Sequence, residues 1–358
     1  MTSGITCRAE LDGTVRRLAA EDGPADLADV FPEALWSALV EAGAPKWSLP
    51  KSVGGEELDR LELLDRYRAV AEGSLAAAFI LSQHDAAARR LVAVSERPAA
   101  RIRLPRIAAG TEFCTIGVSQ LTTSRRLGSA ALRAREAGGG RYLLDGAMPW
   151  VTAADRADLF VTGAVLDDGR QILAALPSDR AGLDVRPPLP LAALAASRTT
   201  EVVCREVFVE PEDLLGGPAI DVMAHINAAG TGGLETSALA IGQAYAAISA
   251  LELEADEQTE LVAPARLLRS AADEAWDRLV AAARGGEGAP SSAAVRGVAN
   301  GLVMRATQAH LSARRGRGLL LSDPAQRWAR QALFFLVWSC PTPIAHAAIR
   351  DLAEACSL

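Results

Sequence analysis

The sequence predicts an α+β fold in which a helical segment, a strand-rich segment and a second helical segment follow one another. Apolar residues recur at helical spacing before about residue 110 and after about residue 216. Between these limits, short apolar runs are separated by Gly, Pro and Asp, which is typical of strands. With 358 residues, half of them hydrophobic, the chain is long enough for more than one domain core.

We therefore expect three domains. An N-terminal helical domain spans 1–110, a middle β domain spans 111–216, and a C-terminal helical domain spans 217–358. The middle segment has the size and the frequent turns of a β-sandwich or barrel.

The first domain is predicted to contain helices separated by turns. Leu27–Ala42 and Leu58–Ile80 both have apolar positions at helical spacing. The loop Trp47–Leu58 between them carries a Pro and a Gly-Gly pair, which favour turns. Pro98–Gly110 predicts a further helix that ends at a glycine.

The later elements follow from the same patterns. The runs with strand character are FCTIGVSQL, AALRAREA, RYLLDGA, WVTAA, LFVTGAV, QILAALP and EVVCREVFV. The glycine of RYLLDGA predicts a turn before a short Trp-Val-Thr strand. The long helical runs after them are Val222–Glu254, Leu261–Ala283, Ser291–Arg314 and Pro324–Leu336.

Composition excludes several functional classes. A net charge of −7 and 4% aromatic residues argue against a nucleic-acid partner. Five dispersed cysteines and four scattered histidines fit neither a disulfide framework nor a metal site. The N-terminus does not resemble a signal peptide and no apolar run is long enough to span a bilayer, so we expect a cytoplasmic protein without membrane contact.

Four segments resemble motifs of the acyl-CoA dehydrogenase family. They are Leu49–Leu58 (LPKSVGGEEL), Ile116–Gly128 (IGVSQLTTSRRLG), Asp145–Phe160 (DGAMPWVTAADRADLF) and Ser197–Gly216 (SRTTEVVCREVFVEPEDLLG). The resemblance extends over nearly the whole chain. It implies an N-terminal helical domain, a middle β domain and a C-terminal four-helix bundle. It also implies FAD as cofactor and assembly into homodimers or homotetramers.

The resemblance assigns three residues to the flavin. It implies that Trp150 lies beside the isoalloxazine ring, that the Thr152 hydroxyl reaches N5, and that Ser119 serves the pyrimidine edge. A flat, largely apolar ring with a polar edge needs such an aromatic face and short directed hydroxyls. The alternative is that Trp150 is a core residue of the sheet and Thr152 an ordinary strand residue.

The chain departs from the family in the segment that follows Ser119. Ser124-Arg125-Arg126 stands where the family has Gly-Ser-Asp. The side chains of Arg125 and Arg126 could bind phosphate groups of CoA or of the dinucleotide, or this stretch could be a solvated loop. Gln120 replaces an acidic residue of the family pattern.

The C-terminal domain departs as well. The family's Arg-x-x-Phe-Gly motif is absent from Leu253–Ala263, and Arg315–Leu319 (RGRGL) replaces a Gly-Gly-x-Gly turn. In Asp323–Ala332, which resembles an arginine-containing helix of the family, Gln331 replaces an aspartate.

The usual catalytic carboxylate is also missing. α,β-Dehydrogenation of an acyl thioester requires a base for the α-proton. Ser339 occupies the position of the family's usual glutamate, and the alternative position maps to Gly232 and Gly233. Glu235 lies about one helical turn further on and is a candidate for a relocated base, although a solvated or capping role is the alternative. No catalytic role is assigned to His84, His225 or His346.

The sequence thus favours a FAD-dependent, acyl-CoA dehydrogenase-like oxidoreductase that acts on a CoA- or carrier-linked acyl thioester. Two alternatives remain open. One is a catalytically inactive member of the fold with a scaffold or binding role. The other is a flavin monooxygenase on the same scaffold, which needs no thioester base.

Overall fold

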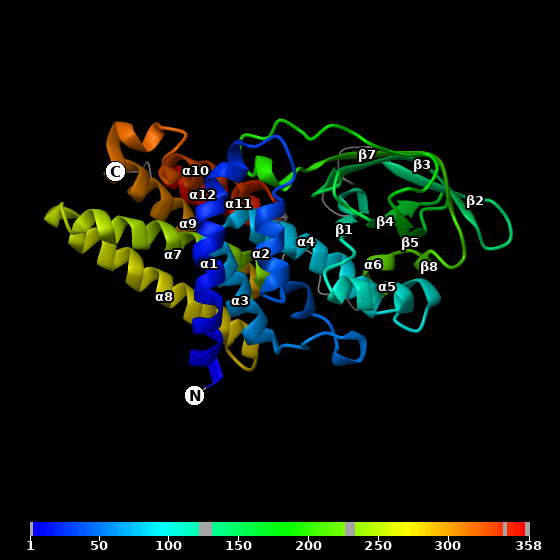
Figure 1. Cartoon of the computed structure of the whole chain (residues 1–358), viewed down its shortest axis with the longest axis horizontal. Coiled ribbons are helices and arrows are strands. Elements are labelled where there is room, and N and C mark those ends of the chain that lie inside the picture. The colour runs from blue at the N-terminus through cyan, green and yellow to red at the C-terminus, as the bar shows by residue number, and fades with distance from the viewer. Residues whose placement is uncertain (1–2, 122–130, 226–232, 339–341, 355–358) are drawn as a thin grey trace.

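The computed structural model describes residues 3–121, 131–225, 233–338 and 342–354. Figure 1 shows the sheet at one end of the molecule and the C-terminal helices at the other, with the N-terminal helices between them. This mixed architecture, mainly helical with one sheet, confirms the predicted α+β fold class.

The N-terminal helices are more numerous than the periodicity predicted. They are α1 (Ser3–Leu27), α2 (Glu33–Glu41), α3 (Arg60–Gly73), α4 (Leu75–Val92) and α5 (Pro98–Ala108). The helix predicted from Leu27 begins only at Glu33, because Pro32 occupies its N-cap.

The long helix predicted over Leu58–Ile80 is interrupted at Ser74. This residue has an extended conformation, and its hydroxyl accepts a hydrogen bond from the backbone N–H of Ala77 at 3.1 Å. A serine that caps the next helix in this way ends α3 and starts α4.

The strands form one hydrogen-bonded sheet within the described residues. They are β1 (Cys114–Gly117), β2 (Leu132–Glu136), β3 (Tyr142–Val151), β4 (Leu159–Val165), β5 (Gln171–Pro177), β6 (Leu183–Val185), β7 (Thr200–Val209) and β8 (Leu214–Ala219). Their order is β6-β7-β3-β2-β4-β5-β8, and β1 pairs in parallel with β4. The sequence did not predict β6 and β8. The last strand, β8, continues to Ala219, three residues beyond the limit expected at 216.

The glycine turn predicted before the Trp-Val-Thr segment is wrong, because Gly146 lies inside the continuous strand β3. The register with β7 shifts between Leu144 and Gly146, and Gly146 has a φ of 123°. A Cβ at this position would lie 2.1 Å from the carbonyl oxygen of Ala131. The glycine therefore allows a bulge in the strand instead of a chain reversal.

The C-terminal helices agree closely with three of the four predicted runs, whereas the run predicted over Val222–Glu254 is interrupted at the extended N-cap Gly233, and the last helix was not predicted. They are α6 (Val222–His225), α7 (Leu234–Ala255), α8 (Val262–Arg284), α9 (Ser292–Arg314), α10 (Pro324–Ala332), α11 (Phe334–Val337) and α12 (Thr342–Glu354). Helix α7 packs against α8, α9 and the N-terminal helix α3. At the crossing with α3, a Cβ on Gly242 would lie 2.2 Å from the carbonyl oxygen of Arg68. The glycine thus permits close backbone approach.

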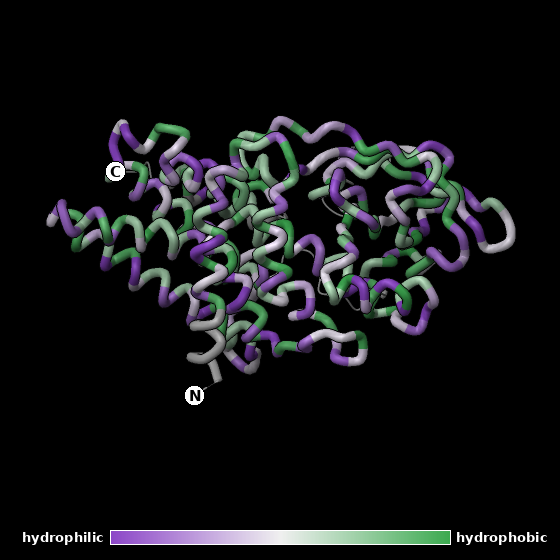
Figure 2. Tube along the Cα trace, in the orientation of Figure 1, coloured by the Kyte–Doolittle hydropathy of each residue, from purple (hydrophilic) through white to green (hydrophobic). Residues whose placement is uncertain are grey.

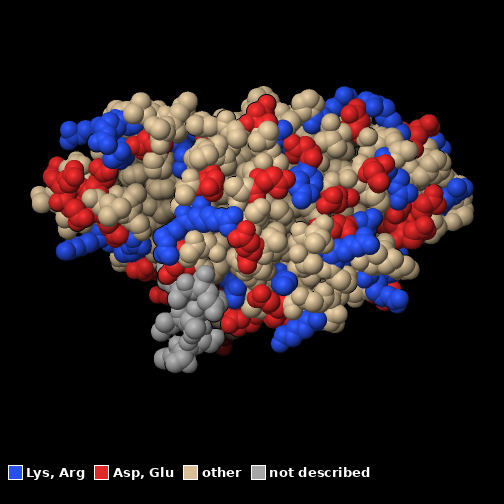
Figure 3. Space-filling model, viewed as in Figure 1, with Lys and Arg blue, Asp and Glu red and all other residues tan. Residues whose placement is uncertain are grey.

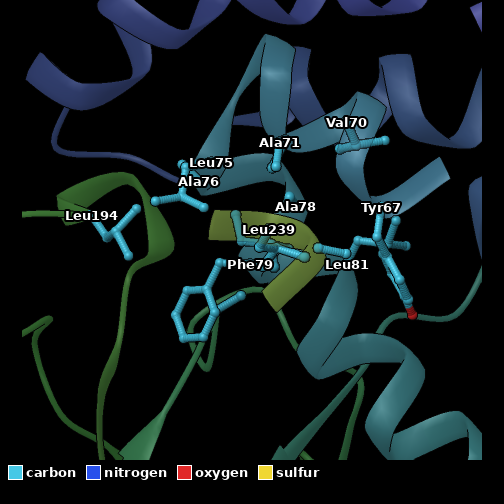
Figure 4. Packing of buried hydrophobic residues seen from close by; sticks show 14 of the residues in the cluster. Tyr67, Val70, Ala71, Leu75, Ala76, Ala78, Phe79, Leu81, Leu194 and Leu239 are labelled. Atoms are coloured by element: carbon cyan, nitrogen blue, oxygen red, sulfur yellow. The ribbon is translucent and has the colours of Figure 1, made fainter. Parts of the chain in front are cut away.

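Apolar side chains from α3, α4 and α7 meet in the main core. Figure 4 shows Phe79 of α4 and Leu239 of α7 close together, with Leu194 of the β6–β7 connection beside them. In Figure 2 the apolar residues alternate with polar ones along the helices, and Figure 3 shows acidic and basic side chains interspersed on the visible face. In the described part of the chain, none of the helices is both long and apolar enough to cross a membrane.

Candidate functional site

Trp150 lies near the end of β3 with its side chain directed away from the core. The residue is 41% exposed, whereas Met148 and Val151 on the same strand are buried. Alternation along a strand places neighbouring side chains on opposite faces, and this explains the contrast with Val151. Trp150 is therefore not a core residue of the sheet, and a large aromatic face is available to a ligand.

Thr152 follows β3 directly and is held from two sides. Its carbonyl accepts a hydrogen bond from the Thr115 hydroxyl of β1 at 2.8 Å. Its own hydroxyl lies 3.3 Å from the hydroxyl of Thr199, which in turn lies 2.8 Å from that of Ser197. The three residues Thr152, Thr199 and Ser197 form a buried row of hydroxyls. These contacts fix the segment after Trp150 between β1 and the start of β7.

Ser119 begins the short 3-10 helix η3 (Ser119–Leu121) after β1. This turn packs against β3 and β4, so Ser119 and Trp150 lie on neighbouring elements of the sheet. Gln120 is buried, and its amide donates hydrogen bonds to the carbonyls of Gly117 at 2.9 Å and Gly163 at 2.8 Å. Gln120, which stands where the family pattern has an acidic residue, thus anchors the turn to the sheet.

These residues have the chemistry that a flavin requires. An exposed indole offers an apolar face, and Ser119 and Thr152 offer short hydroxyls on rigid elements. The Thr152 hydroxyl already has a neighbour in Thr199, so a further hydrogen bond to a ligand would extend the hydroxyl row. Arg125 and Arg126 lie outside the described residues.

Glu235 stands in the first turn of α7, two residues after the N-cap Gly233. Its carboxylate lies 3.3 Å from the guanidinium of Arg89 on α4. Glu235 is thus turned toward the N-terminal helices and is neither freely solvated nor a cap of its own helix. Gly232 and Ser339, the other positions considered for a base, lie outside the described residues.

Arg89 belongs to a group of polar residues that the sequence did not predict as a site. Asp85 lies one turn before Arg89 on α4 and is fully buried, and the hydroxyl of Tyr67 on α3 donates a short hydrogen bond to it. Figure 4 shows the ring of Tyr67 at the edge of the core with its oxygen directed away from the apolar side chains. We call Tyr67, Asp85, Arg89 and Glu235 the Arg89 cluster.

Burial dominates the protonation of this cluster. It raises the pKa of Asp85 to about 6, although Arg89 and Tyr67 act in the opposite direction and Glu235 adds to the increase. Burial, followed by the charge of Asp85, also raises the pKa of Tyr67 well above its usual value. At neutral pH the tyrosine is therefore neutral, and Asp85 titrates close to neutrality.

His84, the neighbour of Asp85, has a structural role. Its Nδ1 lies 3.1 Å from the carbonyl oxygen of Cys114, and its ring contacts Trp36 and Phe113. Burial lowers the pKa of His84 to about 4, so the imidazole is neutral. Among the described residues, no group of His, Cys, Asp and Glu could hold a metal ion.

Comparisons with known proteins show which proteins this chain is similar to. No family profile matches the chain. The probable acyl-CoA dehydrogenase YngJ of Bacillus subtilis is 28% identical over 163 residues, which cover 44% of this chain and 43% of that protein. Benzylmalonyl-CoA dehydrogenase of Aromatoleum aromaticum is 27% identical over 251 residues, which cover 69% of this chain and 66% of that protein.

In sequence, the chain is similar to acyl-CoA dehydrogenases. It matches less than two thirds of the length of these curated relatives.

The fold is shared over the full length of solved structures. Butyryl-CoA dehydrogenase from Megasphaera elsdenii superposes with a TM-score of 0.82 at 18% identity, covering 98% of each chain. A nitrososynthase from Micromonospora carbonacea superposes with a TM-score of 0.73 at 22% identity, covering 100% of this chain and 97% of the other. At these identities the likeness concerns the fold alone.

The departures from the acyl-CoA dehydrogenase pattern in the C-terminal domain have structural explanations. The RGRGL segment forms a 3-10 turn between α9 and α10, and the preceding Arg314 pairs with Asp323 at 2.7 Å. Gln331, in place of the family's aspartate, accepts a hydrogen bond from the Gln243 amide of α7 at 2.9 Å. The Arg314–Asp323 pair and the Gln331–Gln243 hydrogen bond therefore hold α10 against its neighbours.

Aromatic contacts fix Trp338, which directly follows α11. The ring of Trp338 stacks on Phe334 with a centroid distance of 5.3 Å and meets Phe79 of α4 edge-on at 4.7 Å. The indole of Trp338 thus attaches the end of α11 to the core.

Proposed function

We propose that the protein is a FAD-dependent oxidoreductase that removes hydrogen from the α- and β-carbons of an acyl thioester, linked either to CoA or to a carrier protein. The observation that carries this proposal is the exposed indole of Trp150 beside the fixed Thr152 segment and the Ser119 turn. Two relatives whose names specify dehydrogenases of CoA esters support it.

In this proposal, Trp150 covers one face of the flavin ring, and the hydroxyls of Ser119 and Thr152 serve its polar edge. The Thr115–Thr152 hydrogen bond keeps the segment after Trp150 in place before the cofactor binds. When bound, FAD supplies the acceptor for the hydride that leaves the β-carbon of the substrate. Arg125 and Arg126 are proposed to bind phosphate groups of the cofactor or of CoA.

The test begins with the visible spectrum of the purified protein, with and without added FAD. We expect bound flavin, and we expect Trp150→Ala to weaken FAD binding about tenfold or more, because an aromatic face worth about 1–3 kcal/mol is lost. Trp276→Ala on α8 is the matched control, because Trp276 lies among the C-terminal helices beside Arg68 and should leave the affinity unchanged. Wild-type protein that takes up no FAD would contradict the proposal.

A flavin monooxygenase is the second candidate, because Ser339 occupies the usual glutamate position and such an enzyme needs no thioester base. Oxygen uptake driven by a reduced nicotinamide or a reductase, dependent on substrate, would favour this reading. Bleaching of the flavin by an acyl thioester under anaerobic conditions would favour dehydrogenation and would exclude a purely inactive scaffold.

We also propose that the chain assembles as a homodimer or homotetramer. Leucines at positions 319, 320 and 321 expose more than half of their surface on the turn between α9 and α10. Three consecutive exposed leucines are unusual on a monomer surface. Light scattering coupled to gel filtration would determine the mass of the assembly, and a monomer at micromolar concentration would contradict this proposal.

A further inference from the structure

The dehydrogenation proposed above requires a base, and the family's two usual positions offer none. The structure instead presents the Arg89 cluster, in which two carboxylates, one guanidinium and one phenol meet at the contact of α3, α4 and α7. We propose that this cluster is the proton-accepting centre of the protein. Glu235 takes the proton, and Asp85 is a positioning residue that controls how strongly Arg89 holds Glu235. This inference rests on the proposed function.

The geometry of α4 lets one guanidinium serve both carboxylates. Asp85 and Arg89 are four residues apart and therefore lie on the same face of the helix. Arg89 contacts Glu235 at 3.3 Å, and its positive charge also acts on Asp85 and on Tyr67. When both carboxylates are ionised, the cluster has one more negative than positive charge. The two acids then compete for Arg89.

Asp85 has an unused hydrogen-bonding group inside the cluster. Tyr67 donates to one carboxylate oxygen, whereas the other oxygen, Oδ1, is buried without a hydrogen-bond partner. The Ser48 hydroxyl from the loop between α2 and α3 lies close enough to lower the pKa of Asp85, but neither atom meets full hydrogen-bond geometry. A fully buried carboxylate with one unsatisfied oxygen is costly to keep for packing alone.

Charged and titratable groups on several neighbouring elements interact with Asp85. Arg89 lies on its own helix, Tyr67 on α3 and Glu235 on α7, and the charge of Asp85 acts on the Cys114 thiol of β1. Burial raises the pKa of Cys114 well above its usual value, so this thiol stays neutral. The competition for Arg89 is therefore between Asp85 and Glu235.

The cluster is connected to the candidate flavin residues through β1. His84, next to Asp85, contacts the carbonyl of Cys114, and the following residue, Thr115, donates its hydroxyl to the carbonyl of Thr152. Helix α4 packs directly on β1. Glu235 itself is partly exposed, with 21% of its side chain accessible.

The proposed step is a simple proton transfer. The C–H bond at the α-carbon of the thioester breaks, and an O–H bond forms on the Glu235 carboxylate. The electron pair stays on the carbon and is delocalised into the thioester carbonyl. Return of a solvent deuteron completes an exchange reaction, so this step can be measured without any oxidant.

The experiment uses the full-length protein with butyryl-CoA as probe in D2O and follows deuterium at the α-carbon by mass spectrometry. We expect exchange in the wild type and a loss of about 100-fold or more in Glu235→Gln, the usual contribution of a general base. Glu252→Gln is the matched control, because Glu252 lies on the same helix and pairs with Arg269 at 2.6 Å. It should retain the wild-type rate.

The positioning role of Asp85 is tested by the pH profile. In the wild type, Asp85 ionises near pH 6 and then begins to compete with Glu235 for Arg89, so the exchange rate should change around this pH. Asp85→Asn cannot ionise, so this inflection near pH 6 should be absent from its profile. A purely structural role would change the rate and keep the inflection.

The inference fails if the wild type shows no exchange, if Glu235→Gln exchanges like the wild type, or if Asp85→Asn keeps the wild-type inflection near pH 6. The proposed function fails separately if no flavin binds. Exchange that depends on Glu235 in a protein without flavin would support the inference alone. Bound flavin that butyryl-CoA bleaches equally in Glu235→Gln and wild type would support the function alone.

Discussion

At the scale of single residues, burial determines which side chains carry unusual chemistry in this protein. Asp85 illustrates this, because burial outweighs the favourable effects of Arg89 and Tyr67 on its pKa. Trp150 is the opposite case, since a large aromatic residue remains exposed where the sheet could have buried it. A buried carboxylate and an exposed tryptophan both depart from the usual distribution of residues between core and surface, and both lie at positions for which we propose a function.

Replacement of Asp85 by Asn should stabilise the protein at alkaline pH. The pKa of Asp85 is about 6 in the fold and 3.8 in its ordinary state, so the folded protein prefers the protonated acid. The contribution of Asp85 to the free energy of unfolding is therefore greatest below pH 4 and is lost as the pH rises through 6. Asparagine avoids this cost of about two pKa units, on the order of 3 kcal/mol at pH 8. Urea unfolding at pH 5 and pH 8 would measure it.

Asp273→Asn is the control for this comparison. Asp273 also accepts a hydrogen bond from a tyrosine hydroxyl, that of Tyr245 at 2.6 Å, but it is exposed on α8. We expect its replacement to change stability by similar amounts at both pH values. If Asp85→Asn raised the free energy of unfolding equally at pH 5 and pH 8, the raised pKa assigned to Asp85 would be contradicted.

The sequence indicated only part of the candidate site. Ser119, Trp150 and Thr152 were recognised because their motifs are local, and their flavin roles remain predictions. The Arg89 cluster was missed because its members come from three helices that are distant along the chain. The one local signal was the spacing of Asp85 and Arg89, which occurs on many solvated helices.

At the scale of elements, helices and strands were predictable where their periodicity is strong, as in α8 and α9. The errors arose at single residues that override the pattern. Ser74 divides one predicted helix by capping the next, and Gly146 continues a strand where a turn was expected. Local hydrogen bonds and backbone conformation decide such positions, and apolar spacing does not report them.

Gly146→Ala should destabilise the sheet strongly. The residue has a φ of 123°, and the added Cβ would lie 2.1 Å from the Ala131 carbonyl oxygen, so backbone strain and a backbone clash add together. We expect a loss of about 2 kcal/mol or more in the free energy of unfolding.

Gly138→Ala separates the two contributions to this loss. Gly138 also has a positive φ of 78°, but a Cβ there would meet nothing within 4 Å. Its replacement should cost only about 1 kcal/mol. Thermal unfolding of both variants would measure the difference, and equal losses would mean that the predicted clash in β3 is relieved at no cost.

At the scale of the whole molecule, the two ends of the chain are joined by a buried ion pair. Asp22 of α1 accepts from Arg327 of α10 at 2.7 Å, and both side chains are nearly inaccessible. The Ser74 hydroxyl also donates to Asp22. This contact connects the N-terminal helices with the C-terminal ones, and the sequence did not reveal it because 305 positions separate the partners.

Asp22→Ala should destabilise the whole protein by about 3–5 kcal/mol, since it leaves the Arg327 guanidinium buried without its counter-ion. Asp22→Leu combined with Arg327→Met should recover much of this loss, because no unpaired charge remains. Asp167→Ala is the control, since its pair with Arg133 is exposed and should contribute less than about 1 kcal/mol. Urea unfolding would measure all three. A small loss in Asp22→Ala would mean that water reaches Arg327.

The course of β8 past residue 216 has a practical consequence for dissecting the protein. A fragment that stops at Gly216 would lack the half of β8 that pairs with Gln171, and the edge of β5 would be exposed there. An unpaired strand edge of this kind promotes association between fragments. Recombinant versions of the sheet region should therefore extend at least through α6, and a shorter product is expected to precipitate.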